Sequence, residues 1–205
     1  ELPATTLSKY CYGGMFYGCT GITTAPDLPA TNLVDYCYSQ IFRNCTGLTT
    51  APELRATTLA MGCYSSMFCA CTALTEAPEL PATTLANECY STMFYNCTSL
   101  TTAPKLPVTT LTNKCYHQMF YGCTSLKNVD FGDGVYEIDE SAFAECTSLE
   151  HIVLPDGLKT IDDRAFQDCT ALTDITLPAD ILEIDQLAFF GCSSLSSIHY
   201  GGSTE

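Results

Sequence analysis

Apolar residues recur along this chain at two fixed periods. A phenylalanine marks each unit, first every 26 residues and, after Phe120, every 23 residues. A cysteine follows three residues after each phenylalanine, and a leucine or isoleucine follows six residues after it. Such periods are typical of repeat arrays, in which each unit buries its apolar side against its neighbours. The marker residues are Phe16, Phe42, Phe68, Phe94, Phe120, Phe143, Phe166 and Phe189.

One side of each unit predicts a short strand. The segment Leu-x-x-Ile-x-Leu has apolar residues at period two, as at 151–154 and 174–177. Stacked units then form a parallel sheet. The 26-residue units carry a proline in this segment, which removes one ladder donor, so we expect shorter strands there. These prolines are Pro26, Pro52, Pro78 and Pro104.

The other side of the 26-residue units predicts a helix. Leu33, Cys37 and Ile41 recur at helical spacing, and Tyr38 and Phe42 follow the same spacing. We expect a helix of about three turns in each of these units. A tyrosine next to the first cysteine recurs in all five, and we expect it to be half-buried between helices, with an aromatic binding stripe as the alternative. In the 23-residue units three residues are missing, so only a single short turn fits around each Ala-Phe pair.

The unit Ile-x-x-x-Ala-Phe-x-x-Cys-x-x-Leu-x-x-Ile-x-Leu-Pro at 161–178 resembles the BspA-like leucine-rich repeats of bacterial surface proteins. The 26-residue units are similar to a variant of it. The sequence departs from the family at Asp139, Asp162 and Asp185, where glycine is common. The resemblance implies an α/β leucine-rich repeat fold, a right-handed solenoid with one short parallel strand per repeat, helices opposite in the 26-residue repeats and short turns in the 23-residue repeats.

We expect a single domain over 1–205, with five 26-residue repeats at 1–127 and three acidic 23-residue repeats at 128–205. We also expect the chain to be a piece of a longer protein. The acidity is uneven: the formal net charge is −15, yet residues 128–205 hold 16 acidic and 2 basic side chains. So few basic residues argue against nucleic acid as a partner. No apolar run approaches the roughly 18 residues of a transmembrane segment.

The 14 cysteines fall almost entirely into two columns of the repeat. In the first column Ile138, Ile161 and Ile184 replace cysteine, which identifies that cysteine as a buried apolar side chain. Two cysteines of one unit, eight positions apart on a helix, would lie about 12 Å apart, too far for a disulfide. We therefore expect buried free thiols. Cys69 belongs to neither column, and we expect it to be the most exposed thiol.

We find no catalytic motif, no zinc pattern and no cofactor fingerprint, so we expect a protein that is not an enzyme and has no cofactor. The recurring Asp139, Asp162 and Asp185 allow two interpretations. Stacking places them in a ladder that suits calcium, which prefers oxygen ligands. We favour the alternative, in which each aspartate caps the turn before Ala-Phe and no metal is bound.

Two outward columns of the sheet vary from unit to unit and are our candidate ligand-facing positions. They lie directly before and directly after the inward Ala/Ile/Val column. In the 26-residue units the second column is occupied by Pro26, Pro52, Pro78 and Pro104, which we also expect to face a ligand. An ordered face with varied side chains favours a non-enzymatic binding function. The residues are Thr24, Thr50, Glu76, Thr102, Asn128, His151, Asp174 and Ser197 in the first column, and Asp130, Val153, Thr176 and His199 in the second.

The family resemblance implies adhesion to a protein or glycoprotein of the host matrix or a neighbouring cell, at the bacterial cell surface or after secretion. A structural spacer that presents another domain of a larger surface protein is the alternative.

Overall fold

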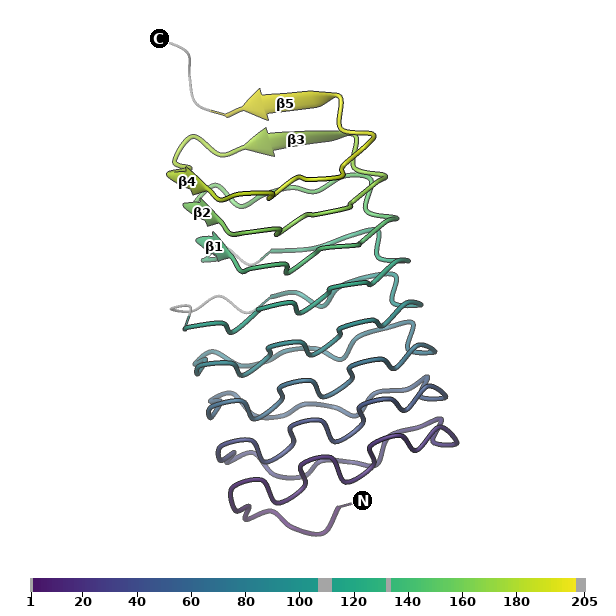
Figure 1. The fold of residues 1–205 in the computed structure, drawn as a ribbon. Helices are drawn as coiled ribbons and strands as arrows, with labels where there is room; N and C mark the ends of the chain where they lie inside the picture. The colour runs from purple at the N-terminus through teal and green to yellow at the C-terminus, as the bar shows by residue number, and fades with distance from the viewer. Residues whose placement is uncertain (1, 107–111, 132–133, 202–205) are drawn as a thin grey trace.

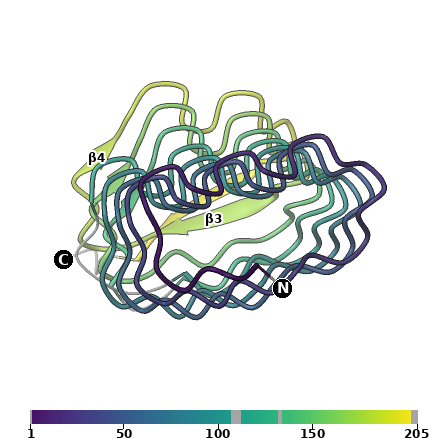
Figure 2. The same ribbon diagram turned by 90° about the horizontal axis from the view of Figure 1, so that it is seen from below.

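The repeats stack on one another as successive turns of a coil. A computed structural model describes residues 2–106, 112–131 and 134–201. The N-terminal repeat lies at one end of the stack and the C-terminal repeat at the other (Figure 1). Viewed along the stack, successive coils follow a similar path, and each is slightly offset from the one before (Figure 2).

The predicted strand side is regular only near the C-terminus. Strands β3 (Asp174–Leu177) and β5 (Ser197–Tyr200) pair in parallel, with Asp174 opposite Ser197. In the 26-residue repeats this side is reduced to single bridges, among them Thr24 to Thr50 and Glu76 to Thr102. Prolines follow two residues later, so the shortening there agrees with the lost ladder donors.

The segment 151–154 does not form the strand that its sequence predicts. In the described part of the chain, one backbone hydrogen bond ties its start to the next repeat, from Thr173 N to Glu150 O at 3.2 Å. One regular strand per repeat was therefore too strong a prediction for this side.

A second parallel sheet lies elsewhere in the 23-residue repeats and was not predicted. It contains β1 (Glu137–Ile138), β2 (Thr160–Ile161) and β4 (Glu183–Ile184), in the order β1-β2-β4. Each strand ends at an isoleucine that replaces the first-column cysteine. The β-branched side chain favours an extended backbone, so the replacement agrees with the local change in structure.

The predicted helices of the 26-residue repeats are wrong. Among the described residues there is no helix, and the side opposite the first sheet is a chain of tight turns that we call the turn ribbon. Within it alternate amides bond to the carbonyl three residues back, as from Cys89 N to Ala86 O at 3.1 Å. The remaining amides bond to the next repeat, as from Tyr90 N to Cys115 O at 3.2 Å. The ribbons span 8–19, 34–45, 60–71, 86–97, 112–123, 139–146, 162–169 and 185–192.

The spacing between repeats explains why the ribbon replaces a helix. Neighbouring strands lie about 4.8 Å apart, whereas packed helices need about 8–10 Å. If successive repeats were about 4.8 Å apart on the strand side and 8–10 Å apart on a helical side, the stack would curve strongly. In this structure the stacked phenylalanine rings have centroids only 5.4 to 5.8 Å apart. The turn ribbon fits that distance because its amides reach directly to the next repeat.

Every fourth residue of the ribbon takes a left-handed backbone conformation. The first 26-residue repeat shows the pattern at Tyr10 (φ 61°), Gly14 (φ 63°) and Gly18 (φ 71°). For a residue with a Cβ this conformation costs about 1–2 kcal/mol of conformational free energy. We infer that the hydrogen bonds between repeats offset this cost. Glycine or asparagine at the last of these positions, as in Asn44, Asn96 and Gly122, is the sequence signal for it.

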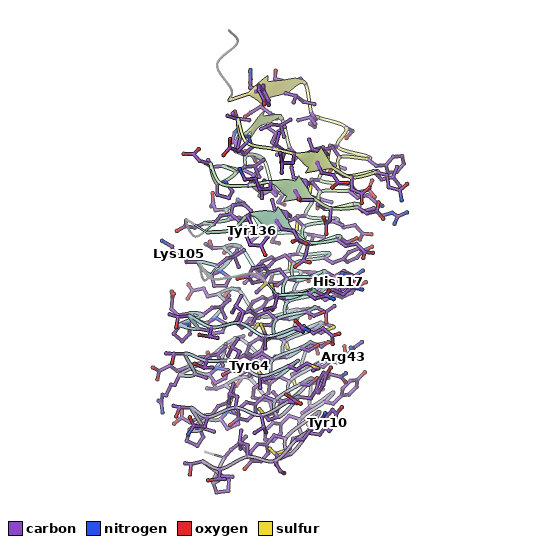
Figure 3. All side chains as sticks on the ribbon, turned by 90° about the vertical axis from the view of Figure 1, so that its left-hand side faces the viewer. Tyr10, Arg43, Tyr64, Lys105, His117 and Tyr136 are labelled. Carbon is purple, nitrogen blue, oxygen red and sulfur yellow. The ribbon has the colours of Figure 1, made fainter. Side chains whose placement is uncertain are left out.

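The core consists of ladders of identical side chains. The phenylalanine rings stack along the chain, and the tyrosine rings from Tyr12 to Tyr116 stack with centroids 5.8 to 6.2 Å apart. The tyrosines pack between repeats as predicted, but Tyr38, Tyr64 and Tyr90 are fully rather than half buried. Figure 3 shows Tyr64 within the stack and Tyr10, Arg43 and His117 along one edge.

The cysteine columns are buried, as predicted, in all but the terminal repeats. All 14 cysteines are free thiols, and Cys11 and Cys19 of the first repeat are exposed. The prediction for Cys69 was wrong, because only 4% of its surface is exposed. Burial in the turn ribbon also raises the pKa of the Cys69 thiol.

Candidate functional site

The residues of the first candidate column lie on the strand side, and several are paired in register with the next repeat. Parallel bridges join Thr24 to Thr50, and Glu76 to Thr102 and on to Asn128. Asp174 and Ser197 pair in the β3–β5 sheet. The side chains from Thr24 to His151 are exposed, while Asp174 and Ser197 are half-buried. Backbone pairing between repeats therefore fixes the spacing of these positions within three stretches of the column, Thr24–Thr50, Glu76–Asn128 and Asp174–Ser197.

The second column is exposed only in the C-terminal half. Asp130, Thr176 and His199 are exposed, and Val153 is 82% exposed. In the 26-residue repeats Pro52 and Pro104 are buried, and Pro26 and Pro78 are half-buried. The expectation that these prolines face a ligand was therefore wrong for Pro52 and Pro104. Removing their apolar rings from water is favourable, which explains why they are buried.

Hydroxyl groups next to the first column donate hydrogen bonds to backbone carbonyls of the preceding repeat. Thr49 Oγ1 donates to Thr23 O at 3.0 Å, and Thr101 Oγ1 donates to Thr75 O at 3.3 Å. Ser196 Oγ makes the equivalent bond to Thr173 O at 3.2 Å. Each bond joins one repeat to the one before it, so this row stiffens the edge of the candidate surface.

The structure brings His151 and Asp174 together on that surface. His151 Nδ1 lies 3.1 Å from Asp174 Oδ2, and Thr173 Oγ1 donates to the same oxygen at 2.8 Å. The hydroxyl of Thr173, and then the nearby His151 and His199, lower the pKa of Asp174. The sequence signal for this pair is the period, because His151 and Asp174 are one 23-residue period apart and occupy the same column.

A hollow of about 760 Å³ lies beside this pair, and a second hollow of about 470 Å³ adjoins it. Val153, Leu154 and Asp156 line both, so the two hollows adjoin, and together we call them the acidic hollow. Its other lining residues are Val129, Asp130, Phe131, His151, Ile152, Pro155, Gly157, Asp174, Thr176, Pro178, Ala179, Asp180 and Gly201.

The recurring aspartates of the 23-residue repeats do not gather as a set of three. Asp139 and Asp162 lie with Glu137 so that one carboxylate oxygen of each is within 4.8 Å of the others, and Asp185 is outside this group. Asp139 Oδ2 accepts the amide of Tyr116 in the preceding repeat at 2.8 Å, whereas Asp185 Oδ1 accepts the adjacent amide of Gln186 at 2.7 Å. Calcium remains a hypothesis, with Glu137 in the place of Asp185.

Burial changes the acidity of this carboxylate cluster. Only 7% of Asp139 is exposed, and burial raises its pKa to about 7, with the nearby Glu137 and Asp162 adding to the rise. Burial and then Glu137 raise the pKa of Asp162 to about 6. Asp139 and Asp162 therefore hold protons at a pH where ordinary aspartates are ionised.

A second histidine has an acidic neighbour on the turn-ribbon side. His117 Nδ1 lies 3.7 Å from Glu140 Oε2, and burial lowers the pKa of His117. The two are again equivalent residues of successive repeats.

Stacked coils with one phenylalanine ladder and an exposed strand face define the chain as a repeat protein of the leucine-rich class. The family model for the BspA type leucine rich repeat region matches residues 4–119 and 113–205, with 6 copies. The chain belongs to this family. Among the described residues, no helix is long and apolar enough to cross a membrane. Comparison with curated protein sequences gives no match.

Solved structures of bacterial leucine-rich repeat proteins are similar in fold. A leucine rich cell surface protein from Faecalibacterium prausnitzii is 22% identical over 93% of the chain and 62% of its own, with a TM-score of 0.54. A leucine-rich repeat protein from Eubacterium ventriosum is 23% identical over 89% of the chain and 47% of its own, with a TM-score of 0.58. The leucine rich repeat protein of T. pallidum is 32% identical over 60% of the chain and 56% of its own, with a TM-score of 0.50. The chain thus spans less than two thirds of each.

Proposed function

We propose that this chain is a non-enzymatic binding domain of a bacterial cell-surface or secreted protein and that it attaches to a protein or glycoprotein ligand of the host matrix or a neighbouring cell. The observation that carries the proposal is the first exposed column. Its side chains change from repeat to repeat, from threonine to glutamate, asparagine, histidine and aspartate, while the phenylalanine ladder below never changes.

The contrast between these positions supports a binding function. Constant residues are the buried ones, where one wrong volume would break the stack. Most of the variable residues are exposed, and several are held in register by backbone pairing with the next repeat. A rigid surface loses little conformational entropy on binding, which favours affinity. The name of the similar protein from Faecalibacterium prausnitzii, a cell surface protein, supports the proposed location.

Attachment of beads coated with the 205-residue chain to immobilised extracellular-matrix extract tests this proposal. We expect beads carrying the unsubstituted chain to attach and beads carrying a four-alanine variant of the first column to lose most of that attachment. A control variant replaces four exposed residues outside both columns, and we expect it to attach normally. The column variant replaces Thr50, Glu76, Thr102 and His151, and the control replaces Thr58, Thr84, Thr170 and Glu183.

Melting curves of both variants establish that they are folded. Equal attachment by the two variants contradicts binding through this face and favours the spacer alternative. Failure of the unsubstituted chain to attach contradicts the proposed class of partner.

A further inference from the structure

We infer that the acidic hollow is a docking surface for a basic, extended segment of a protein partner, in which lysine or arginine side chains alternate with apolar ones. This inference rests on the proposed binding function and names the chemistry of the partner at one part of the strand face.

The charged side chains that line the hollow are aspartates, so its formal charge is negative. Asp130, Asp156, Asp174 and Asp180 line it, and no lysine or arginine does. Lys159 Nζ lies 2.8 Å from Asp180 Oδ2 but is not part of the lining. The surrounding chain, residues 128–205, adds no compensating cations beyond 2 basic side chains against 16 acidic ones. A positively charged partner would be attracted along the whole depression.

The carboxylates are spread too widely to chelate one ion. Among the described residues, the group of carboxylates and histidines close enough to share a metal is Glu137, Asp139 and Asp162, none of which lines the hollow. Separate carboxylates distributed along a depression suit several cationic groups on one chain. Hydrogen bonds from Thr173 and His151 keep the pKa of Asp174 low, so its charge persists in the neutral range.

The hollow also offers apolar surface between its charges. Val153 is 82% exposed and lies where the two parts of the hollow meet. Pro155 and Pro178 line the depression on either side of it. An exposed β-branched side chain between carboxylates would pack against an apolar residue of the partner while its neighbours pair with lysine or arginine. The alternation of charge and apolar surface therefore favours an extended peptide over a compact cation.

Calorimetric titration of the 205-residue chain with a short synthetic peptide of alternating lysine and valine tests the inference. A peptide of alternating glutamate and valine is the reference. We expect the lysine peptide to bind, the glutamate peptide not to bind, and the affinity to fall as salt is added. The double variant Asp156→Asn with Asp174→Asn should bind the lysine peptide about tenfold more weakly.

A matched control removes the same charge outside the hollow. Glu183→Gln with Asp185→Asn changes one carboxylate in β4, a strand of the other sheet, and one directly after it, and should change the affinity about twofold or less. Asp156→Asn alone serves as a second test if the double variant melts early. Equal weakening by both double variants overturns the inference, because it would show only the effect of net charge.

Failure of the lysine peptide to bind also overturns the inference. The proposed function would still stand if the variant of Thr50, Glu76, Thr102 and His151 lost attachment in the bead assay. The two proposals therefore fail separately.

Discussion

The thiol of Cys97 donates a hydrogen bond to the backbone carbonyl of Phe68 in the preceding repeat, over an Sγ to O distance of 3.1 Å. The same carbonyl accepts the amide of Cys71 at 2.9 Å. Equivalent thiol bonds recur along the column, over 3.0 to 3.2 Å, from Cys45, Cys71, Cys123, Cys146, Cys169 and Cys192. Cysteine suits this position because it is small and apolar and can still donate to a buried carbonyl.

Replacing Cys97 with alanine should lower the free energy of unfolding by about 1–2 kcal/mol, because the change removes both buried volume and a hydrogen bond. Cys192 provides the matched control, since it makes the same bond at 3.1 Å but is only half-buried. Cys192→Ala should cost less than half as much, because water can replace the lost contact. Urea unfolding of both variants measures the difference, and equal losses would contradict a buried thiol ladder.

Alkylation of the native protein should modify Cys11 and Cys19 first, because they are the exposed thiols. The buried thiols should resist, since burial raises the pKa of Cys71 and of Cys89 to about 12 and leaves almost no thiolate. Cys69 should be protected with them. Mass spectrometry after a short alkylation identifies the sites. Under denaturing, non-reducing conditions all 14 thiols should react, and a count near zero would mean that the columns are oxidised.

The phenylalanine ladder should be most sensitive at its centre. Phe94 is fully buried and stacks at 5.7 Å on Phe68 and 5.6 Å on Phe120. Phe94→Ala should therefore cost about 3–5 kcal/mol. Phe16 is half-buried and stacks on one neighbour, Phe42, at 5.7 Å. Phe16→Ala should cost about half as much, as judged by urea unfolding, and a larger loss at Phe16 would contradict the ladder.

The carboxylate cluster should make stability depend on pH. The folded-state pKa of Asp139 is raised by burial to about 7, from an ordinary value of 3.8. Its stabilising contribution is therefore complete below pH 3.8 and is lost as the pH rises through about 7. The hydrogen bond from the Tyr116 amide and then Lys114 oppose this rise, and Glu137 and Asp162 increase it. Asp139→Asn should raise the free energy of unfolding at pH 8 by about 2 kcal/mol and have little effect at pH 4.

Melting temperatures from pH 4 to pH 8 measure this effect. Asp27→Asn is the control, since Asp27 is exposed and outside the cluster, and its profile should follow that of the unsubstituted chain. An Asp139→Asn variant that loses stability at pH 8 would show that the ionised carboxylate is needed there, either for the Tyr116 amide or for a bound cation.

Aligning the repeats on one another predicted from the sequence which residues are buried. Cys37 and Ile138 occupy one column, and Phe94 lies in another, and all three are buried. The exposed first column could be predicted for the same reason, because its residues vary while their neighbours do not. Such predictions hold whatever the local backbone is, since stacking alone buries equivalent positions together.

The local backbone could not be predicted from the same spacing. Apolar residues four apart, such as Cys37 and Ile41, fit a helix and also a ribbon of four-residue turns. What decides between them is the distance between repeats, which is a property of the stack and not of one unit. The left-handed positions at Gly18, Asn44 and Gly122 carried the missing signal. The pairing of His151 with Asp174 needed only the 23-residue period and could have been found.

The hydrogen-bond partner of the Phe94 amide tests the stacked turn ribbon most directly. In the structure this amide donates to Met119 O in the next repeat at 2.9 Å. NMR scalar couplings across hydrogen bonds should therefore connect the nitrogen of Phe94 to the carbonyl carbon of Met119. A coupling from Phe94 to the carbonyl of Tyr90, four residues back, would instead indicate a helix and contradict the ribbon on which the spacing of the binding face depends.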